Sequence, residues 1–179
     1  FVEPMDSTEV TLNILDSDGM LVRSYSSKKD KSFKKFIGGP SPEATLAVKK
    51  GVNRFNWDLR RESIPGVEGV FMLGDYRGGL VAPGTYTLVL SADEASVETT
   101  VEVIPDPRIK ATQAAYAAQE EILKGAVDAT REIHESVNAM QEVKQQLEQV
   151  QETLKKRTDL EELKGAAKEI VEKITDWED

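Results

Sequence analysis

The period of the hydrophobic residues changes once along this chain, and that change constrains the fold more than any other feature of the sequence. From Thr8 to Val103, apolar residues alternate with polar ones, which is typical of strands with one buried face. After Thr112 they recur every seven residues, which is typical of a long amphipathic helix. The sequence therefore predicts an α+β chain of two domains, a β domain over residues 1–105 and a helical domain over residues 106–179.

The β domain contains six short alternating segments separated by turn residues. The first two are joined by DSDG, in which Gly19 is available for a positive φ, so they predict a hairpin. Short strands at this density within about 100 residues predict an antiparallel sandwich of the immunoglobulin or fibronectin type. The segments lie at residues 8–15, 20–27, 44–48, 53–60, 84–92 and 96–104.

The segment NRFNWDLR shows the alternation most clearly. Phe55, Trp57 and Leu59 occupy alternate positions, and two arginines follow at once. We expect these three side chains to point inward from a central strand, with Trp57 as the core anchor. The same alternation predicts inward side chains in the last two segments, namely Tyr86, Leu88, Leu90, Val97, Val101 and Val103.

Two long segments interrupt the strands. Residues 26–42 are rich in Lys, Gly and Pro, which predicts a solvated surface loop, with a basic binding patch as the alternative. Residues 61–84 hold five glycines between two prolines, too irregular for strands throughout. Phe71, Met72 and Tyr76 in this segment either pack against the sandwich, the favoured interpretation, or are available to a partner.

The segment IPDPR marks the border between the domains, and its two prolines predict a short, fairly rigid joint. Beyond it the spacing predicts a helix over about 113–156 and a second over about 159–177, which begins at the capping box TDLE. The short turn between them makes an antiparallel helical hairpin. The first helix carries its heptad positions at Ala126, Ile133, Met140, Leu147 and Leu154, with Val143 and Val150 beside them. The apolar stripe of the second consists of Leu160, Leu163, Ala167, Ile170, Ile174 and Trp177.

The two predicted helices differ in length. The second covers less than half of the first, so part of the long apolar stripe lacks a partner within the hairpin. That surface needs the sandwich, a third helix or another molecule. Self-association through the helices is therefore one of the expected properties of the chain.

Composition excludes several functional classes. A net charge of −9 argues against nucleic acid as a partner, and no run approaches the 18 apolar residues of a membrane span. Without cysteine the chain has no disulfide, zinc–thiolate site or thiol nucleophile. The sequence begins at Phe1, so we expect it to be a piece of a longer protein.

No pattern of catalytic residues is present. His134 is the only histidine and lies between helical acidic residues, as a surface or boundary histidine does. DSDG mimics the start of a calcium loop, but Ser27 stands at the twelfth position, where a bidentate glutamate is needed, so a turn is favoured. The sequence predicts no catalytic residue, no metal site and no cofactor, and thus no enzyme.

The order of four sequence pieces carries a family resemblance. VTLNILDSDGMLVRSYSS is followed by GVNRFNWDLR, APGTYTLVLSA and VEVIPDPRI, and then by helical sequence. In this order they resemble the C-terminal region of large secreted bacterial proteins that begin with a sortilin-like, BNR-repeat β-propeller and are often labelled glycosyl hydrolases. The first three pieces are also similar to the immunoglobulin-like domain of the flagellar hook-capping protein and to C-terminal sorting modules. The matching positions are Gly51, Asn53, Arg54, Phe55, Trp57, Asp58, Leu59 and Arg60, with PGTY at 83–86 and DPR at 106–108.

The resemblance implies a structural part of a larger protein. The matching residues are fold positions, so no catalytic residue is implied, and the hydrolase label would belong to the propeller. A secreted, periplasmic or cell-envelope location is implied, as is further helical sequence after DWED.

Three functions follow as hypotheses. The favoured one is a non-catalytic accessory module that packs on the upstream propeller or binds an envelope partner. The second is carbohydrate binding in support of a glycosidase, with Phe71, Tyr76 and Trp177 as candidate stacking residues. The third is self-association through the helices.

Overall fold

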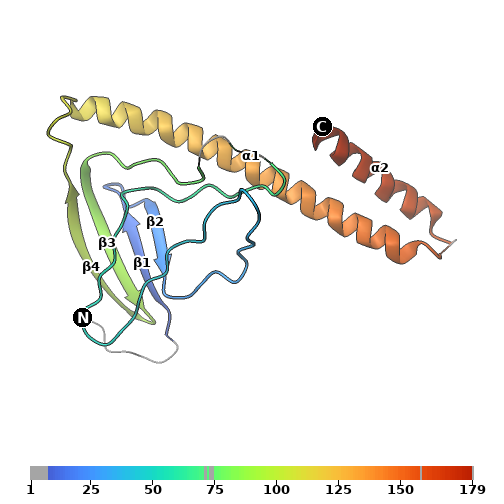
Figure 1. Ribbon diagram of the computed structural model, residues 1–179, viewed down its shortest axis with the longest axis horizontal. Helices are drawn as coiled ribbons and strands as arrows, with labels where there is room; N and C mark the ends of the chain where they lie inside the picture. Colours follow the sequence, from blue (N-terminus) through green and yellow to red (C-terminus); the bar gives the residue numbers. More distant parts are fainter. Residues whose placement is uncertain (1–7, 71, 73–74, 158, 179) are drawn as a thin grey trace. The chain divides into compact units, whose positions relative to one another are not determined.

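The computed structural model of the chain describes residues 8–70, 72, 75–157 and 159–178. It contains a four-stranded antiparallel sheet, in the order β2-β1-β3-β4, and two α-helices (Figure 1). The broad α+β class predicted from the sequence is thus confirmed. The elements are β1 (Val10–Leu15), β2 (Leu21–Ser26), β3 (Gly84–Ala92), β4 (Ala95–Val103), α1 (Gln113–Leu154) and α2 (Glu161–Glu178).

The chain divides into two compact units, Phe1–Thr130 and Arg131–Asp179, which we call the β unit and the helical unit. The division falls inside α1, so the first part of this helix belongs to the β unit. This division follows contacts within each unit and does not test where the β domain ends. The domain boundary predicted between residues 105 and 106 stays a prediction.

The core of the β unit lies on one face of the sheet. Ile14 pairs with Leu88 of β3, and Leu12 pairs with Leu90, so apolar side chains from neighbouring strands meet on the same face. Ile14 is completely buried, as alternation in β1 requires. The predicted inward positions are confirmed for Tyr86, Leu88, Leu90, Val101 and Val103, which all belong to this core.

Val97 is the exception among the predicted inward residues. It pairs with Leu90 near the start of β4, yet 67% of it is exposed. Among the described residues β4 has one neighbouring strand, β3, so it is an edge of the sheet. The exposure of Val97 shows that no described segment packs over the start of β4.

Residues 44–48 and 53–60 cover the sheet, but neither forms a strand, so the prediction of strands there is wrong. Leu46, Val48, Phe55 and Trp57 nevertheless belong to the core or pack against it, as the alternation predicted. The ring of Phe55 meets Tyr25 edge-on at 4.6 Å between centroids, and the ring of Trp57 meets Tyr86 at 5.5 Å. An extended segment can bury every second side chain without being a strand. A strand also needs backbone hydrogen bonds to a neighbouring segment.

Local hydrogen bonds occupy some backbone N–H groups in and beside these segments. Asn53 Oδ1 accepts the N–H of Lys49 at 2.9 Å, and Asp58 Oδ1 accepts the N–H of Arg60 at 3.2 Å. Short polar side chains that bond neighbouring backbone groups compete with sheet pairing in this way. An isolated bridge joins Arg60 to Leu80, and the N–H of Leu46 donates to the carbonyl of Ser26 in β2 at 2.9 Å, but no continuous ladder forms among the described residues.

Leu59 does not point inward, which corrects the sequence prediction. Its φ is 59°, in the left-handed region that disfavours residues with a Cβ, and its side chain is exposed. The left-handed conformation of Leu59 breaks the alternation of inward side chains directly after Trp57. It also brings the carbonyl of Arg60 to the indole, whose Nε1–H donates to it at 3.0 Å.

Tyr86 closes the corner where the chain enters β3. Its hydroxyl donates to the carbonyl of Ala82, four residues earlier, at 2.7 Å. Burial of the ring, together with the nearby negative charge of Glu120, raises the pKa of Tyr86 to about 12.

This pKa predicts a loss of stability in alkali. The folded state holds the Tyr86 proton more tightly than the unfolded chain, so its contribution is complete below pH 10 and is lost as the pH rises to about 12. We expect Tyr86→Phe to flatten this part of the stability profile, measured by urea unfolding at several alkaline pH values. If tyrosinate absorbance showed every tyrosine ionising near pH 10, the buried corner would be wrong.

The turn predicted at DSDG is confirmed. Asp16 Oδ1 accepts the N–H groups of Asp18 at 3.1 Å and Met20 at 2.9 Å, and Gly19 has a φ of 76°. The carboxylate of Asp16 is thus used in holding the turn.

Both predicted helices are confirmed, with ends that lie within two residues of the predictions. The hydroxyl of Thr112 caps α1 by accepting the N–H of Ala115 at 3.2 Å. Thr158, the predicted cap of the second helix, lies outside the described residues. Within the β unit, Arg61 and Glu120 of α1 form an ion pair at 2.5 Å. Neither helix is long and apolar enough, over its described residues, to cross a membrane.

The heptad prediction holds for part of the helical unit. Met140, Leu147 and Leu154 are half-buried, as expected for heptad positions. Ile133, by contrast, is exposed, and so are Ala126 in the β unit and the intermediate positions Val143 and Val150.

Candidate functional site

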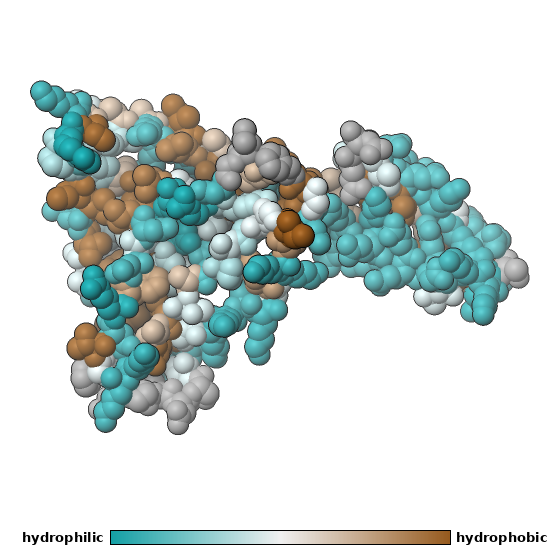
Figure 2. Space-filling view, in the orientation of Figure 1, coloured by the Kyte–Doolittle hydropathy of each residue, from teal (hydrophilic) through white to brown (hydrophobic). Residues whose placement is uncertain are grey.

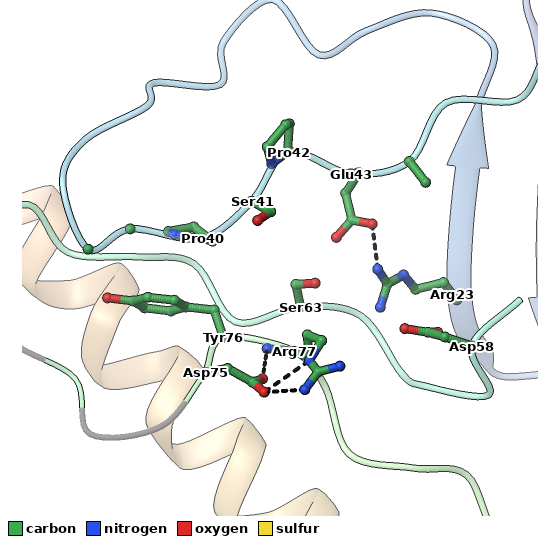
Figure 3. Close-up of a pocket in the computed structure, with 13 residues that line it drawn as sticks. Arg23, Pro40, Ser41, Pro42, Glu43, Asp58, Ser63, Asp75, Tyr76 and Arg77 are labelled. Carbon is green, nitrogen blue, oxygen red and sulfur yellow. Dashed lines mark hydrogen bonds and ion pairs between the residues drawn. The ribbon is translucent and has the colours of Figure 1, made fainter.

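A pocket of about 370 Å³ opens in the β unit between the end of the loop predicted at 26–42 and the irregular segment after Arg61. Figure 3 shows Glu43 reaching toward Arg23 on one side, Asp75 and Arg77 on the other, and Ser63 between them. Its volume lies at the small end of the usual range for ligand sites. This cavity is the candidate site of the β unit.

Arg23 forms one wall, and it is almost fully buried although charged, with 6% of its surface exposed. Its Nη2 donates to Glu43 Oε2 at 2.5 Å, and its Nη1 donates to the carbonyl of Arg61. The guanidinium also lies over the ring of Tyr25, 5.2 Å from its centroid. Nε is buried without a partner among the described residues. Arg23 is therefore held rigidly, with one donor unsatisfied.

Asp75 and Arg77 form the opposite wall. Arg77 donates from Nε and Nη2 to Asp75 Oδ2, at 2.9 and 2.6 Å, and its backbone N–H donates to Oδ1 at 2.7 Å. These hydrogen bonds hold the pKa of the Asp75 carboxyl below its ordinary value. The pair is charged at neutral pH and presents fixed polar groups to the pocket.

Several polar groups of the pocket have no hydrogen-bond partner among the described residues. They are the hydroxyls of Ser41 and Ser63 and the Oδ2 atom of Asp58. Pro40 and Tyr76 supply apolar surface beside them. The pocket holds three carboxylates and two guanidiniums, so its charge is nearly balanced. Such a mixture suits a neutral ligand with hydroxyl groups better than an anion.

The structure brings together few of the residues that the sequence singled out. Tyr76 is buried, which confirms the packed interpretation, and it also lines the pocket. Phe71 lies outside the described residues. Trp177 belongs to the helical unit and His134 is half-buried there. The Lys-rich part of the loop predicted at 26–42 contributes no lysine to the pocket.

Sequence reasoning missed the Arg23–Glu43 pair. Arg23 pairs with Ile14 across the sheet and shares a face with Tyr25, so it occupies a position that alternation reserves for an apolar residue. A charged residue at an inward position of β2 was the signal that would have found it. Its partner, twenty residues later in a loop, has no such signal.

No group of three or more metal-ligating side chains occurs within the described ranges. No family model matches the chain, and neither a curated protein nor a solved structure shows significant similarity to it.

Proposed function

We propose that this chain is a non-catalytic accessory module of a larger secreted or envelope protein, and that the β unit docks on the upstream propeller of the same protein. The observation that carries the proposal is exposed apolar surface in the edge strand β4 and in the segment after it. Val97 in β4, and Ile104 and Ile109 after it, are between 57% and 73% exposed. Figure 2 shows apolar surface over the part of the molecule where Figure 1 places β3 and β4.

An exposed edge of this kind suits a neighbouring domain. β4 is nine residues long and its outer side has no strand partner among the described residues. Edge strands left open in this way pair readily with further segments, and exposed apolar residues mark interaction sites. A neighbouring domain of the parent protein would cover both features at once.

We further propose that the β unit is an immunoglobulin-like sandwich whose second layer has lost regular pairing. Phe55 and Trp57 lie over the sheet as the facing layer of a sandwich does. The bond from the Tyr86 hydroxyl to the carbonyl of Ala82 has the form of a tyrosine corner, a recurring feature of these folds.

Calorimetry between this chain and the separately expressed upstream part of its parent tests the docking. We expect micromolar or tighter binding, lost in the double variant Val97→Lys/Ile104→Lys. The control, Ser96→Lys/Thr100→Lys, adds the same charge to exposed polar positions of β4 and is expected to bind better than the apolar-site variant. If the unmodified chain did not bind the upstream part, the docking proposal would fail.

The pocket favours a second candidate function, binding of a neutral carbohydrate. Asp58, Ser41 and Ser63 offer free acceptors and donors for sugar hydroxyls, and Pro40 offers an apolar face for ring C–H groups. We expect millimolar or tighter binding to a member of a glycan array, weakened by Ser63→Ala. An array with no signal at millimolar ligand would remove this candidate.

A further inference from the structure

The helical unit exposes a row of apolar side chains that we call the apolar seam. Its members are between 42% and 79% exposed, Trp177 most of all. They are spaced by seven residues within each helix, the repeat of helices that pack side by side. The seam consists of Val143 and Val150 in α1 and Leu163, Ile170 and Trp177 in α2.

Both helices place their seam residues on the same side of the hairpin. In α1, Val143 and Val150 each stand four residues before a half-buried residue, Leu147 or Leu154. In α2, Leu163 stands four residues before Ala167, which is buried. α2 runs back antiparallel to α1 after a short connection (Figure 1). Viewed from one end, one helix turns clockwise and its antiparallel neighbour turns anticlockwise. Residues that stand four positions before the more buried face in each helix therefore lie on the same side of the pair.

The hairpin has almost no core of its own. α1 contains no buried residue, and in α2 only Ala167 is buried among the described positions. Two helices bury one stripe each, whereas the helices of a four-helix bundle enclose a core between four stripes. A second hairpin placed on the seam would supply the missing half of such a core.

We propose that the seam binds a second copy of the same hairpin, so that two chains form an antiparallel four-helix bundle with a two-fold axis along its length. In this arrangement α1 of one copy faces α2 of the other, and seam residues of both copies meet in the centre. The inference goes beyond the docking of the β unit and uses a different surface.

The positions that flank the seam fit a second copy. Helix spacing places Gln146 opposite Ala166 of the other copy, and Ala139 opposite Lys173. No two like charges meet, and the alanines leave room for close approach. A seam lined by charges of one sign would have opposed this symmetric pairing.

The exposed area agrees with a reversible dimer. Five side chains of this size and exposure present roughly 500 Å² per copy, comparable to the largest apolar patches on monomers, which are often functional. Two copies together would bury about 1,000 Å², the lower limit for a specific interface. We therefore expect dissociation in the micromolar range rather than a permanent dimer.

Sedimentation velocity of the full chain, from about 1 μM to about 500 μM, tests the proposal. We expect monomer at the low end and dimer at the high end. Trp177 moves out of water on dimerisation, so tryptophan emission should shift to the blue over the same concentration range. Trp57 lies in the β unit, and Trp57→Phe would assign the shift to Trp177.

Two seam variants, Val150→Glu and Ile170→Glu, are each expected to raise the dissociation constant at least about 100-fold, because a carboxylate would be buried. Gln145→Glu adds the same charge on the far side of α1 and should leave it unchanged. Far-UV circular dichroism checks that each variant stays helical.

A chain that is monomeric at every concentration would overturn the proposal, and so would a dimer insensitive to both seam variants. Blue-shifted Trp177 emission at every concentration in a monomer would mean that the seam is covered within one chain, which also overturns it. Loss of binding to the upstream part in the β4 variants leaves this result untouched, so the two proposals fail separately.

Discussion

Trp57→Ala destabilises the β unit by about 3–5 kcal/mol, the expected result for removing a large aromatic side chain from a core. The ring packs against Tyr86, and the indole N–H donates to the carbonyl of Arg60, so the alanine variant loses packing and also leaves that carbonyl without its partner. A loss of this size is a large fraction of the stability of an ordinary domain. Urea unfolding followed by circular dichroism measures it.

Trp57→Phe is the matched variant. It keeps a ring beside Tyr86 and loses the hydrogen bond to Arg60, so we expect a cost of about 1 kcal/mol, well below that of the alanine variant. Equal and small effects of both substitutions would show that residues 53–60 do not cover the sheet. The extended segment would then contribute little to the core.

Glu43→Ala is expected to destabilise the β unit by about 2 kcal/mol. The substitution leaves the guanidinium of Arg23 buried without its countercharge, while its Nε already lacks a partner among the described residues. The side chain of Glu43 is 45% exposed, so in the alanine variant water partly hydrates the guanidinium of Arg23. The expected loss of stability is therefore smaller than for breaking a fully buried pair.

Arg23→Met provides the comparison. It removes the buried charge and keeps an apolar chain of similar length, and the Glu43 carboxylate left behind is partly hydrated. We expect a smaller loss than for Glu43→Ala, about 1 kcal/mol or less, in the same unfolding assay. A larger loss for Arg23→Met would mean that the ion pair contributes net stability, contrary to the desolvation argument.

The fold could be predicted where local pattern decides it. The seven-residue spacing located both helices, and alternation located β1 to β4 and the inward side of Trp57, because these periods follow from backbone geometry. Alternation could not distinguish an extended covering segment from a strand. That difference depends on whether a neighbouring segment offers backbone partners along its length. Here Asn53 and Asp58 accept the N–H groups of Lys49 and Arg60 with their side chains.

The pocket could not be predicted from the sequence. Its walls come from three segments, around Arg23, Glu43 and Asp75, whose meeting depends on how two irregular loops cross the sheet. Loops of this length carry no period, and glycines and prolines indicate only where regular structure stops. Arg23 alone offered a signal, a charge at an inward position.

Because α1 belongs to both compact units, it also bears on the order in which the chain folds. Helices form from local contacts within microseconds, whereas the sheet must bring Ile14 to Leu88 across a long stretch of chain. We expect a helix that extends early across residue 130 to present Glu120, already ordered, to Arg61 as the sheet closes. Stopped-flow circular dichroism should then gain helical signal before Trp57 fluorescence changes, and simultaneous changes would contradict this order.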